Sequence, residues 1–211
     1  MKDTNAFFNG AFFIIFISLF CASCSNAPEK KEEVPVAKDT PAVVVPVETK
    51  RAPIININDT LSIKRIVITM KDSASTHERV SMKLGEIYGV QLAAVISKNN
   101  LKVTGKPIAW YKSKTAPFFF EAGLPVDKRP SKAAPGVQVK EIGTDSVVIA
   151  HFYGPYDLTF QGYDVLKDLL KERKKKIKGA AYEIYVDDPF DSTGRPKDPY
   201  KVQTDIVIPY K

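Results

Sequence analysis

The chain contains an internal repeat, which constrains the fold more than any single motif does. The segment from Gly105 to Tyr111 is echoed by the segment from Gly179 to Tyr185, 74 positions later. Apolar residues upstream follow the same offset: Leu84, Leu92, Val95 and Ile96 correspond to Leu158, Leu166, Leu169 and Leu170. Two copies are too few for a solenoid, so we expect a pseudo-symmetric domain with a ligand-binding groove between its halves.

The N-terminus carries an apolar stretch over 11–20, followed by Cys21-Ala22-Ser23-Cys24. The stretch is too short to span a bilayer and is typical of a signal peptide. The small residues before Cys24 resemble a bacterial lipobox, although Cys21 stands where lipoboxes usually carry Leu. The resemblance implies a signal peptide over 1–23 and a membrane-anchored lipoprotein of the bacterial cell envelope, lipidated on Cys24. The resemblance does not specify the membrane leaflet. The alternatives to a lipoprotein signal are an ordinary cleaved signal peptide and an uncleaved membrane anchor.

Residues 24–53 combine five prolines with Lys, Glu, Val and Ala. No helical or strand periodicity is long enough there to bury a face, so we expect a Pro-rich tether before a folded domain over 54–211. Neither cysteine of the chain lies in the folded domain, since Cys21 belongs to the predicted signal peptide and Cys24 is the first residue of the tether. The folded part therefore has no disulfide, no thiol nucleophile and no Cys-ligated zinc site.

The charge balance is basic, with 31 Lys and Arg against 24 Asp and Glu, a formal net charge of +7. Such a balance permits contact with nucleic acid or with an anionic membrane. For an exported lipoprotein we expect no nucleic-acid partner and a mild attraction to the lipid surface. The sequence says nothing about a protein partner.

Hydrophobic periodicity gives the same order of elements in each half. In the first half, about 61–126, we expect a strand at 61–69, a helix from 75 or 76 to 97, and strands at 107–112 and 118–124. In the second half, 137–211, we expect segments 137–142 and 147–153 as a hairpin or one bent strand, a helix to about 175, and strands at 181–186 and 202–208. A strand–helix–strand–strand unit, used twice, predicts an α+β domain with both helices on one face of an antiparallel sheet.

Short motifs occur in a fixed order along this region. They are Gly105, Pro107, Tyr111 and 121–126 in the first half, and 154–157, Tyr163, Leu166, 182–185, 188–189, 204–206 and Pro209 in the second. Together they resemble the GyrI-like small-molecule-binding domains, also called AraC-type or BmrR-type effector-binding domains, over 61–211. The resemblance implies a curved sheet, two covering helices, and a central groove for bulky cationic or aromatic ligands with a Glu at the position of Glu183. Many members carry a DNA-binding helix-turn-helix, and a signal peptide and tether stand in its place here.

Strand alternation gives an independent argument for the groove. Glu183 and Tyr185 share one face of their strand, and the 74-residue offset matches them with Ala109 and Tyr111. The groove should therefore carry two symmetric tyrosines and one carboxylate. An ionised carboxylate among aromatic rings attracts cations, and the rings add cation–π attraction. We expect Glu183 as the charge partner and Tyr111 and Tyr185 as aromatic walls, against the alternatives of a structural hydrogen-bond acceptor and cross-strand packing.

Two further aromatic residues are candidates for the ligand site. Trp110 shares a face with Ile108 and reaches the groove only if the expected facing is inverted. In the run Phe118-Phe119-Phe120, either Phe119 or Phe120 can line the groove, and we include Phe120 in the site. Core packing is the alternative for both Trp110 and Phe120.

The leading hypothesis is a membrane-tethered module that binds amphipathic or cationic organic molecules. A small hydrolase is the alternative, with Glu183 activating water beside Tyr185. A third hypothesis is haem binding, since SOUL-type haem proteins share the duplicated architecture, and only His77 and His151 could then serve as axial ligands. The aspartates near Gly194 fit no calcium motif, and two lone histidines make no metal site. We therefore expect neither a metal nor a cofactor.

Overall fold

The computed structural model describes residues 51–113, 115–132 and 134–211. The predicted signal peptide, the predicted lipidation residue Cys24 and the tether up to residue 50 lie outside the described residues. Within them, no helix has the length and apolar character needed to cross a membrane.

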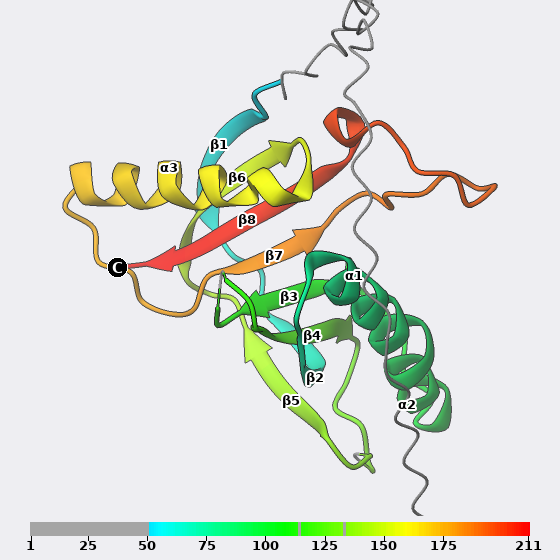
Figure 1. The fold of residues 1–211 in the computed structure, drawn as a ribbon. Coiled ribbons are helices and arrows are strands. Elements are labelled where there is room, and N and C mark those ends of the chain that lie inside the picture. Colours follow the sequence, from blue (N-terminus) through cyan, green and yellow to red (C-terminus); the bar gives the residue numbers. More distant parts are fainter. Residues whose placement is uncertain (1–50, 114, 133) are drawn as a thin grey trace, which may run out of the picture. The chain divides into compact units, whose positions relative to one another are not determined.

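The domain is built on a curved antiparallel sheet in the strand order β1-β6-β8-β7-β3-β4-β2-β5 (Figure 1). The strands are β1 (Ile54–Leu61), β2 (Arg65–Ala74), β3 (Ile108–Tyr111), β4 (Phe118–Val126), β5 (Val137–Ile142), β6 (Ser146–Tyr153), β7 (Tyr182–Tyr185) and β8 (Gln203–Tyr210). The predicted α+β class with a curved antiparallel sheet and two covering helical segments is confirmed.

The helical segment of the first half is interrupted by a wider turn. α1 (His77–Glu86) and α2 (Leu92–Lys98) are joined by the π-helical turn η1 (Ile87–Gln91). Thr76 is the N-cap of α1, since its hydroxyl accepts the backbone N–H of Arg79 at 3.2 Å.

The second half opens its helical segment with a short 3₁₀ turn, η2 (Tyr156–Leu158), which leads into α3 (Thr159–Glu172). α3 ends earlier than the expected residue 175, and Lys174 adopts a left-handed backbone with φ of 54°. A further 3₁₀ turn, η3 (Pro199–Lys201), precedes β8.

The two copies of the repeat are related by a pseudo-two-fold axis at the centre of the sheet. β3 and β7 pair antiparallel through Ile108 with Ile184 and Ala109 with Glu183. Ala109 and Glu183 are equivalent in the repeat and directly opposite each other, so the axis passes between them. Outward from this axis, β3-β4-β2 on one side matches β7-β8-β6 on the other.

The outermost strands are exchanged between the halves, an arrangement that the local sequence pattern does not predict. β1 begins the first half but pairs with β6 of the second, while β5 begins the second half and pairs with β2 of the first. Segments 137–142 and 147–153 are therefore neither a hairpin nor one bent strand. The predicted strand at 61–69 is also wrong in its bounds, because β1 ends at Leu61 and a separate β2 begins at Arg65.

The β1–β2 connection (62–64) and the β5–β6 connection (143–145) cross each other and are joined by hydrogen bonds where they meet. The Ser62 hydroxyl donates to the Asp145 carbonyl at 3.0 Å and accepts the Asp145 N–H at 3.1 Å. Gly143 lies at this crossing with φ of 104°. A Cβ there would overlap the Ile63 carbonyl and lie 2.7 Å from the Cα of Lys64. Only glycine fits this backbone path.

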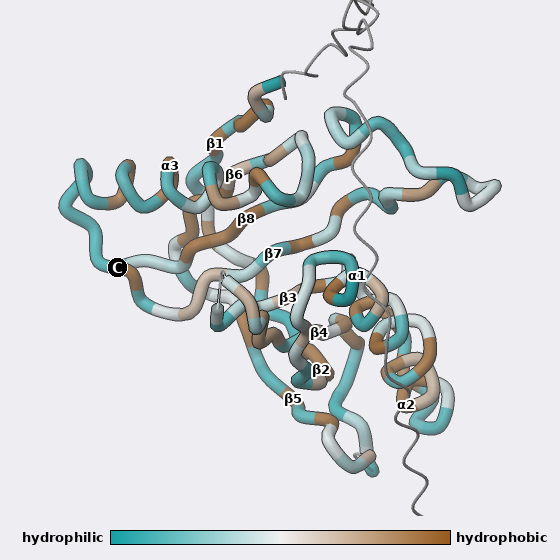
Figure 2. Tube along the Cα trace, in the orientation of Figure 1, coloured by the Kyte–Doolittle hydropathy of each residue, from teal (hydrophilic) through white to brown (hydrophobic). Residues whose placement is uncertain are grey.

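Apolar side chains form separate cores on the two faces of the sheet. On the helical face, α1 and α2 cover the first half, and α3 covers the second, where Figure 2 shows the middle of β8 as apolar. On the opposite face a third core contains Val67, Ile108, Trp110, Val147, Tyr182 and Val207. Burial on both faces explains why the central strands are rich in apolar residues at successive positions.

We expect Gly143→Ala to lower the free energy of unfolding by roughly 3–5 kcal/mol, because it adds a backbone overlap to a strained φ. Gly194→Ala is a matched control, since Gly194 also has a positive φ, of 80°, but no atom lies within 4 Å of its Cβ position. The control should lose only about 1 kcal/mol. Urea denaturation of both variants measures the difference, and equal losses would contradict the crossing as the cause.

Candidate functional site

A cavity of about 270 Å³ opens on the helical face of the sheet and draws its lining from both halves. Its walls come from the start of α1, the ends of β3 and β4, the segment from η2 into α3, and the approach to β7. The lining residues are His77, Tyr111, Ser113, Phe118, Tyr156, Asp157, Thr159, Phe160, Tyr163, Lys167, Ala180, Ala181 and Glu183.

Glu183 is the centre of the site. It lies in β7 at the pseudo-two-fold axis, and only 2% of its surface is exposed. Its Oε1 accepts the Tyr163 hydroxyl at 2.9 Å, and its Oε2 accepts the hydroxyls of Tyr156 and, at 3.2 Å, Tyr185. A buried carboxylate needs such donors, because the hydrogen bonds replace the water that it loses.

Three phenolic hydroxyls form a closed triangle beside the carboxylate. The hydroxyl oxygens of Tyr111 and Tyr156 are 2.8 Å apart, those of Tyr111 and Tyr185 2.8 Å, and those of Tyr156 and Tyr185 2.7 Å. Tyr111 and Tyr185 are the repeat-related pair, so the two halves meet through their hydroxyls. The triangle fixes the three rings relative to Glu183.

The cluster contains more oxygen–oxygen contacts than phenolic protons. Three contacts to Glu183 and three within the triangle make six, whereas the four phenols supply four protons. With the carboxylate ionised, at least two of these contacts lack a phenolic proton. The floor of the cavity is therefore rich in acceptors and suited to a group that brings positive charge or N–H donors.

Burial raises the pKa of the cluster tyrosines above the ordinary value near 10. For Tyr111, Tyr156 and Tyr163, loss of hydration is the largest cause, followed by the charge of Glu183. For Tyr185, burial is again the main reason for the raised pKa, with the neighbouring Tyr156 next. These phenols stay protonated at neutral pH and act as donors.

The charged residues of the lining leave the cavity slightly negative. Asp157 and Glu183 are acidic and Lys167 is basic, a formal sum of −1 for these three residues. Lys167 also has an acidic neighbour outside the cavity, with its Nζ 3.7 Å from Asp164 Oδ1. Among the described residues, no group of three or more His, Cys, Asp or Glu side chains is arranged to hold a metal ion.

The structure separates the predicted site residues into two sets. Glu183 and Tyr111 line the cavity, and Tyr185 joins them through its hydroxyl. Phe120 is 2% exposed and packs behind Tyr111, with the ring centroids 6.1 Å apart. Trp110 lies on the opposite face, against Tyr182, and does not line this cavity.

The two histidines considered as haem ligands lie in different surroundings. His77 is at the edge of the cavity, with its ring centroid 4.4 Å from that of Phe118. His151 is in β6, where its Nδ1 lies 2.7 Å from Asp205 Oδ1 of β8.

Tyr156 and Tyr163 are the site residues that strand alternation could not find. Both come from the η2–α3 segment, and the side of a helix that faces a given strand is not encoded in the strand pattern. A signal was present, since the two tyrosines are seven positions apart and so lie on one face of a helix. Both tyrosines belong to the motifs that carry the family resemblance, but neither was predicted to have a role in the site.

No protein-family model matches the sequence, and no curated protein matches it. Solved structures share the fold. The EcmrR C-terminal domain is 14% identical with a TM-score of 0.59, covering 76% of this chain and 99% of that one. EcmrR in its DNA complex is 15% identical with a TM-score of 0.60, and the match covers 75% of this chain but only 57% of EcmrR. A hydrolase from Listeria innocua is 12% identical with a TM-score of 0.51, covering 77% and 93%.

We expect the domain to lose stability steeply above about pH 10. A folded-state pKa above the unfolded value gives stability that is fully present below the unfolded pKa and is lost as the pH rises toward the folded one. Each buried tyrosine then contributes a slope of about 1.4 kcal/mol per pH unit. Tyr156→Phe should reduce the slope by that amount, measured by urea denaturation between pH 8 and 11. An unchanged slope would contradict a protonated, buried Tyr156.

Proposed function

We propose that the domain is a GyrI-like effector-binding module that takes an amphipathic or cationic organic molecule into the cavity around Glu183. One observation carries the proposal: a buried carboxylate at the floor of an open cavity, surrounded by tyrosine rings. The fold shared with the EcmrR C-terminal domain supports the family assignment.

The lining favours a cation with an aromatic or aliphatic body. Phe118, Phe160 and the tyrosine rings offer apolar contact, and their faces attract positive charge. Glu183 supplies the opposite charge in a site where water is largely displaced, which strengthens the attraction. Phe160 is 47% exposed without ligand and would become covered by a bound molecule.

The test compares an aryl trimethylammonium ion with its neutral tert-butyl isostere, which has the same shape. Titration calorimetry on the full chain should show that Glu183→Gln weakens the cation by roughly 10- to 100-fold, because the charge partner is lost. The isostere should bind the parent and Glu183→Gln alike. An equal loss for both ligands would contradict the role of Glu183 as a charge partner.

Two further variants separate a local effect from a general one. Asp157→Asn, at the exposed edge of the cavity, should weaken the cation by less than Glu183→Gln, because water screens that charge. Glu172→Gln removes an acidic residue at the exposed end of α3, outside the lining, and should leave both affinities unchanged. Circular dichroism and thermal melts check that each variant is folded.

We further propose that the module is held at the bacterial cell envelope through a lipid on Cys24. The lipobox-like residues that precede Cys24 support this proposal, and the Pro-rich segment to residue 53 would then separate the domain from the membrane. Cys24→Ala should move the protein from the membrane fraction to the soluble fraction and remove the acyl mass found by mass spectrometry. An unchanged distribution would contradict anchoring at this residue.

Hydrolysis is the second candidate, because Glu183 and several phenol donors border the same cavity. The Listeria innocua protein with this fold is named a hydrolase. In that case Glu183 would activate water, and Tyr185 would stabilise the developing negative charge. Turnover of small electrophiles with a pH–rate profile that Glu183→Gln abolishes would favour this candidate over passive binding.

A further inference from the structure

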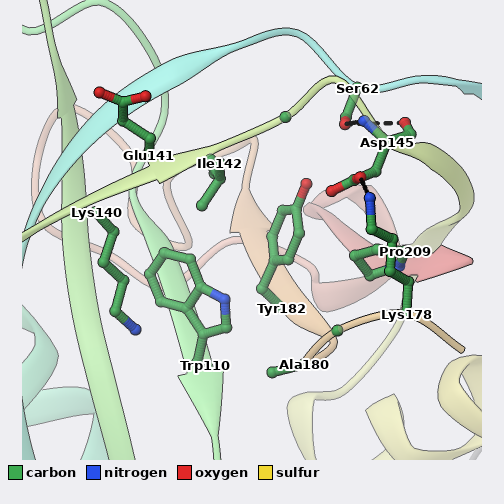
Figure 3. A pocket seen from close by; sticks show the side chains of 12 residues that line it. Ser62, Trp110, Lys140, Glu141, Ile142, Asp145, Lys178, Ala180, Tyr182 and Pro209 are labelled. Atoms are coloured by element: carbon green, nitrogen blue, oxygen red, sulfur yellow. Dashed lines mark hydrogen bonds and ion pairs between the residues drawn. The ribbon is translucent and has the colours of Figure 1, made fainter.

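A second cavity, of about 290 Å³, lies on the face of the sheet opposite to the helices (Figure 3). Two aromatic rings from the central strands form its floor: Trp110 of β3 and Tyr182 of β7, with centroids 5.7 Å apart. β5 contributes Lys140 to one wall, and Lys178 and Asp145 close the far end. None of these residues belongs to the site around Glu183.

The polar atoms of the two aromatic rings have no hydrogen-bond partner in the part of the chain that the structure describes. Trp110 is 8% exposed and Tyr182 is 7% exposed, so both side chains are more than nine-tenths buried. Neither the indole N–H nor the phenol hydroxyl makes a hydrogen bond within the described part of the chain. Because no described side-chain polar atom is both fully buried and unsatisfied, the two groups must reach solvent through the cavity that they line.

Each acidic side chain that lines this cavity is paired with a cation. Asp145 Oδ1 accepts the Lys178 ammonium, and Glu141 pairs with Arg129 at 2.6 Å and with Lys64 at 3.3 Å. Each lysine ammonium has N–H donors beyond the one used in its ion pair, because an ammonium has three N–H groups. Lys140 uses one of them on Glu121 at 2.6 Å.

The lining of this cavity therefore has an excess of hydrogen-bond donors. The indole N–H of Trp110 and the hydroxyl of Tyr182 belong to the lining of a cavity in which each carboxylate is paired with a cation. In Figure 3 the Tyr182 hydroxyl points toward the end formed by Ser62, Asp145 and Lys178. Lys140 Nζ lies 4.8 Å from the centroid of the Trp110 ring, which places positive charge beside the aromatic floor.

We propose that this cavity is a second small-molecule site, selective for a planar aromatic carboxylate. The ligand ring packs against Trp110, Tyr182 and Ile142, and its carboxylate accepts hydrogen bonds from the Trp110 indole and the Tyr182 hydroxyl. Lys140 and Lys178 compensate the negative charge. The ligand chemistry is opposite to that proposed for the cavity around Glu183, and the inference does not depend on that proposal.

The experiment uses the single tryptophan of the chain. In a ¹⁵N-labelled full chain, Trp110 gives the only indole N–H cross-peak, which reports directly on a hydrogen bond made in this cavity. Titration with 2-naphthoate should shift this peak in a saturable way, and 2-naphthamide, which has no charge, should bind more weakly. Calorimetry of the same titration supplies the dissociation constant.

Tyr182→Phe is the decisive variant, because the hydroxyl that it removes has no hydrogen-bond partner among residues 51–113, 115–132 and 134–211. We expect its thermal stability to match that of the parent chain and its affinity for 2-naphthoate to fall about tenfold. Glu183→Gln tests the location, since Ala180 borders both cavities, and it should leave 2-naphthoate binding unchanged.

Three results would overturn the proposal. They are the absence of a saturable shift of the indole peak, an unchanged affinity in Tyr182→Phe, and loss of 2-naphthoate binding in Glu183→Gln, which would place that ligand in the cavity around Glu183. A failure of cation binding there would leave the indole-peak titration unaffected, so the two proposals are tested separately.

Discussion

The two halves of the sheet are joined by a very short antiparallel pairing, and the rest of the structure depends on it. β3 and β7 meet through two residue pairs, with Ala109 opposite Glu183 at the pseudo-two-fold axis. A small residue opposite a large one breaks the symmetry at this point and leaves one carboxylate at the axis. The symmetric tyrosines Tyr111 and Tyr185 then meet beside it, and Tyr156 and Tyr163 of the second half complete its hydrogen bonds.

The same four-residue strand supplies both cavities. Alternate residues of β7 point to opposite faces, so Glu183 and Tyr185 belong to the helical face, whereas Tyr182 belongs to the other. The helical face gathers acceptors, since the cluster of Glu183 and its tyrosines contains more oxygen–oxygen contacts than the phenols have protons. The opposite face gathers donors, since its carboxylates are paired with cations, whereas the Trp110 N–H and the Tyr182 O–H have no hydrogen-bond acceptor among the described residues. One strand thus presents opposite chemistry on its two sides.

The sequence contained the features that local periodicity and the repeat can encode. The 74-residue offset indicated the two-fold relation, and alternation on the central strands placed Glu183, Tyr111 and Tyr185 on one face. Alternation also put Trp110 on the other face, and that argument outweighs the aromatic character that had made Trp110 a candidate for the groove. Phe120 shares a face with Ala122 and is covered by the first-half helices, which side-chain alternation alone cannot reveal.

Strand pairing between distant segments could not be read from local patterns. The segments 137–142 and 147–153 are adjacent in sequence, which suggested a hairpin, yet they pair with strands of different halves. β1 was missed as a separate strand because most of its side chains are exposed and its sequence carries no buried face. Tyr156 and Tyr163 were missed as site residues because the packing of a helix on a sheet is set by tertiary contacts.

The exchanged edge strands imply something about how such a domain can arise. Each unit of two strands, a helical segment and two strands sends its first strand to the other unit, so neither unit can complete its own half of the sheet. A protein with only one unit would need a second copy to supply the missing strand, and the pair would close around a true two-fold axis. The present fold is thus equivalent to a strand-swapped homodimer whose subunits have become one chain. Linking the subunits allows their sequences to differ, and a single glutamate at the axis is possible only when they do.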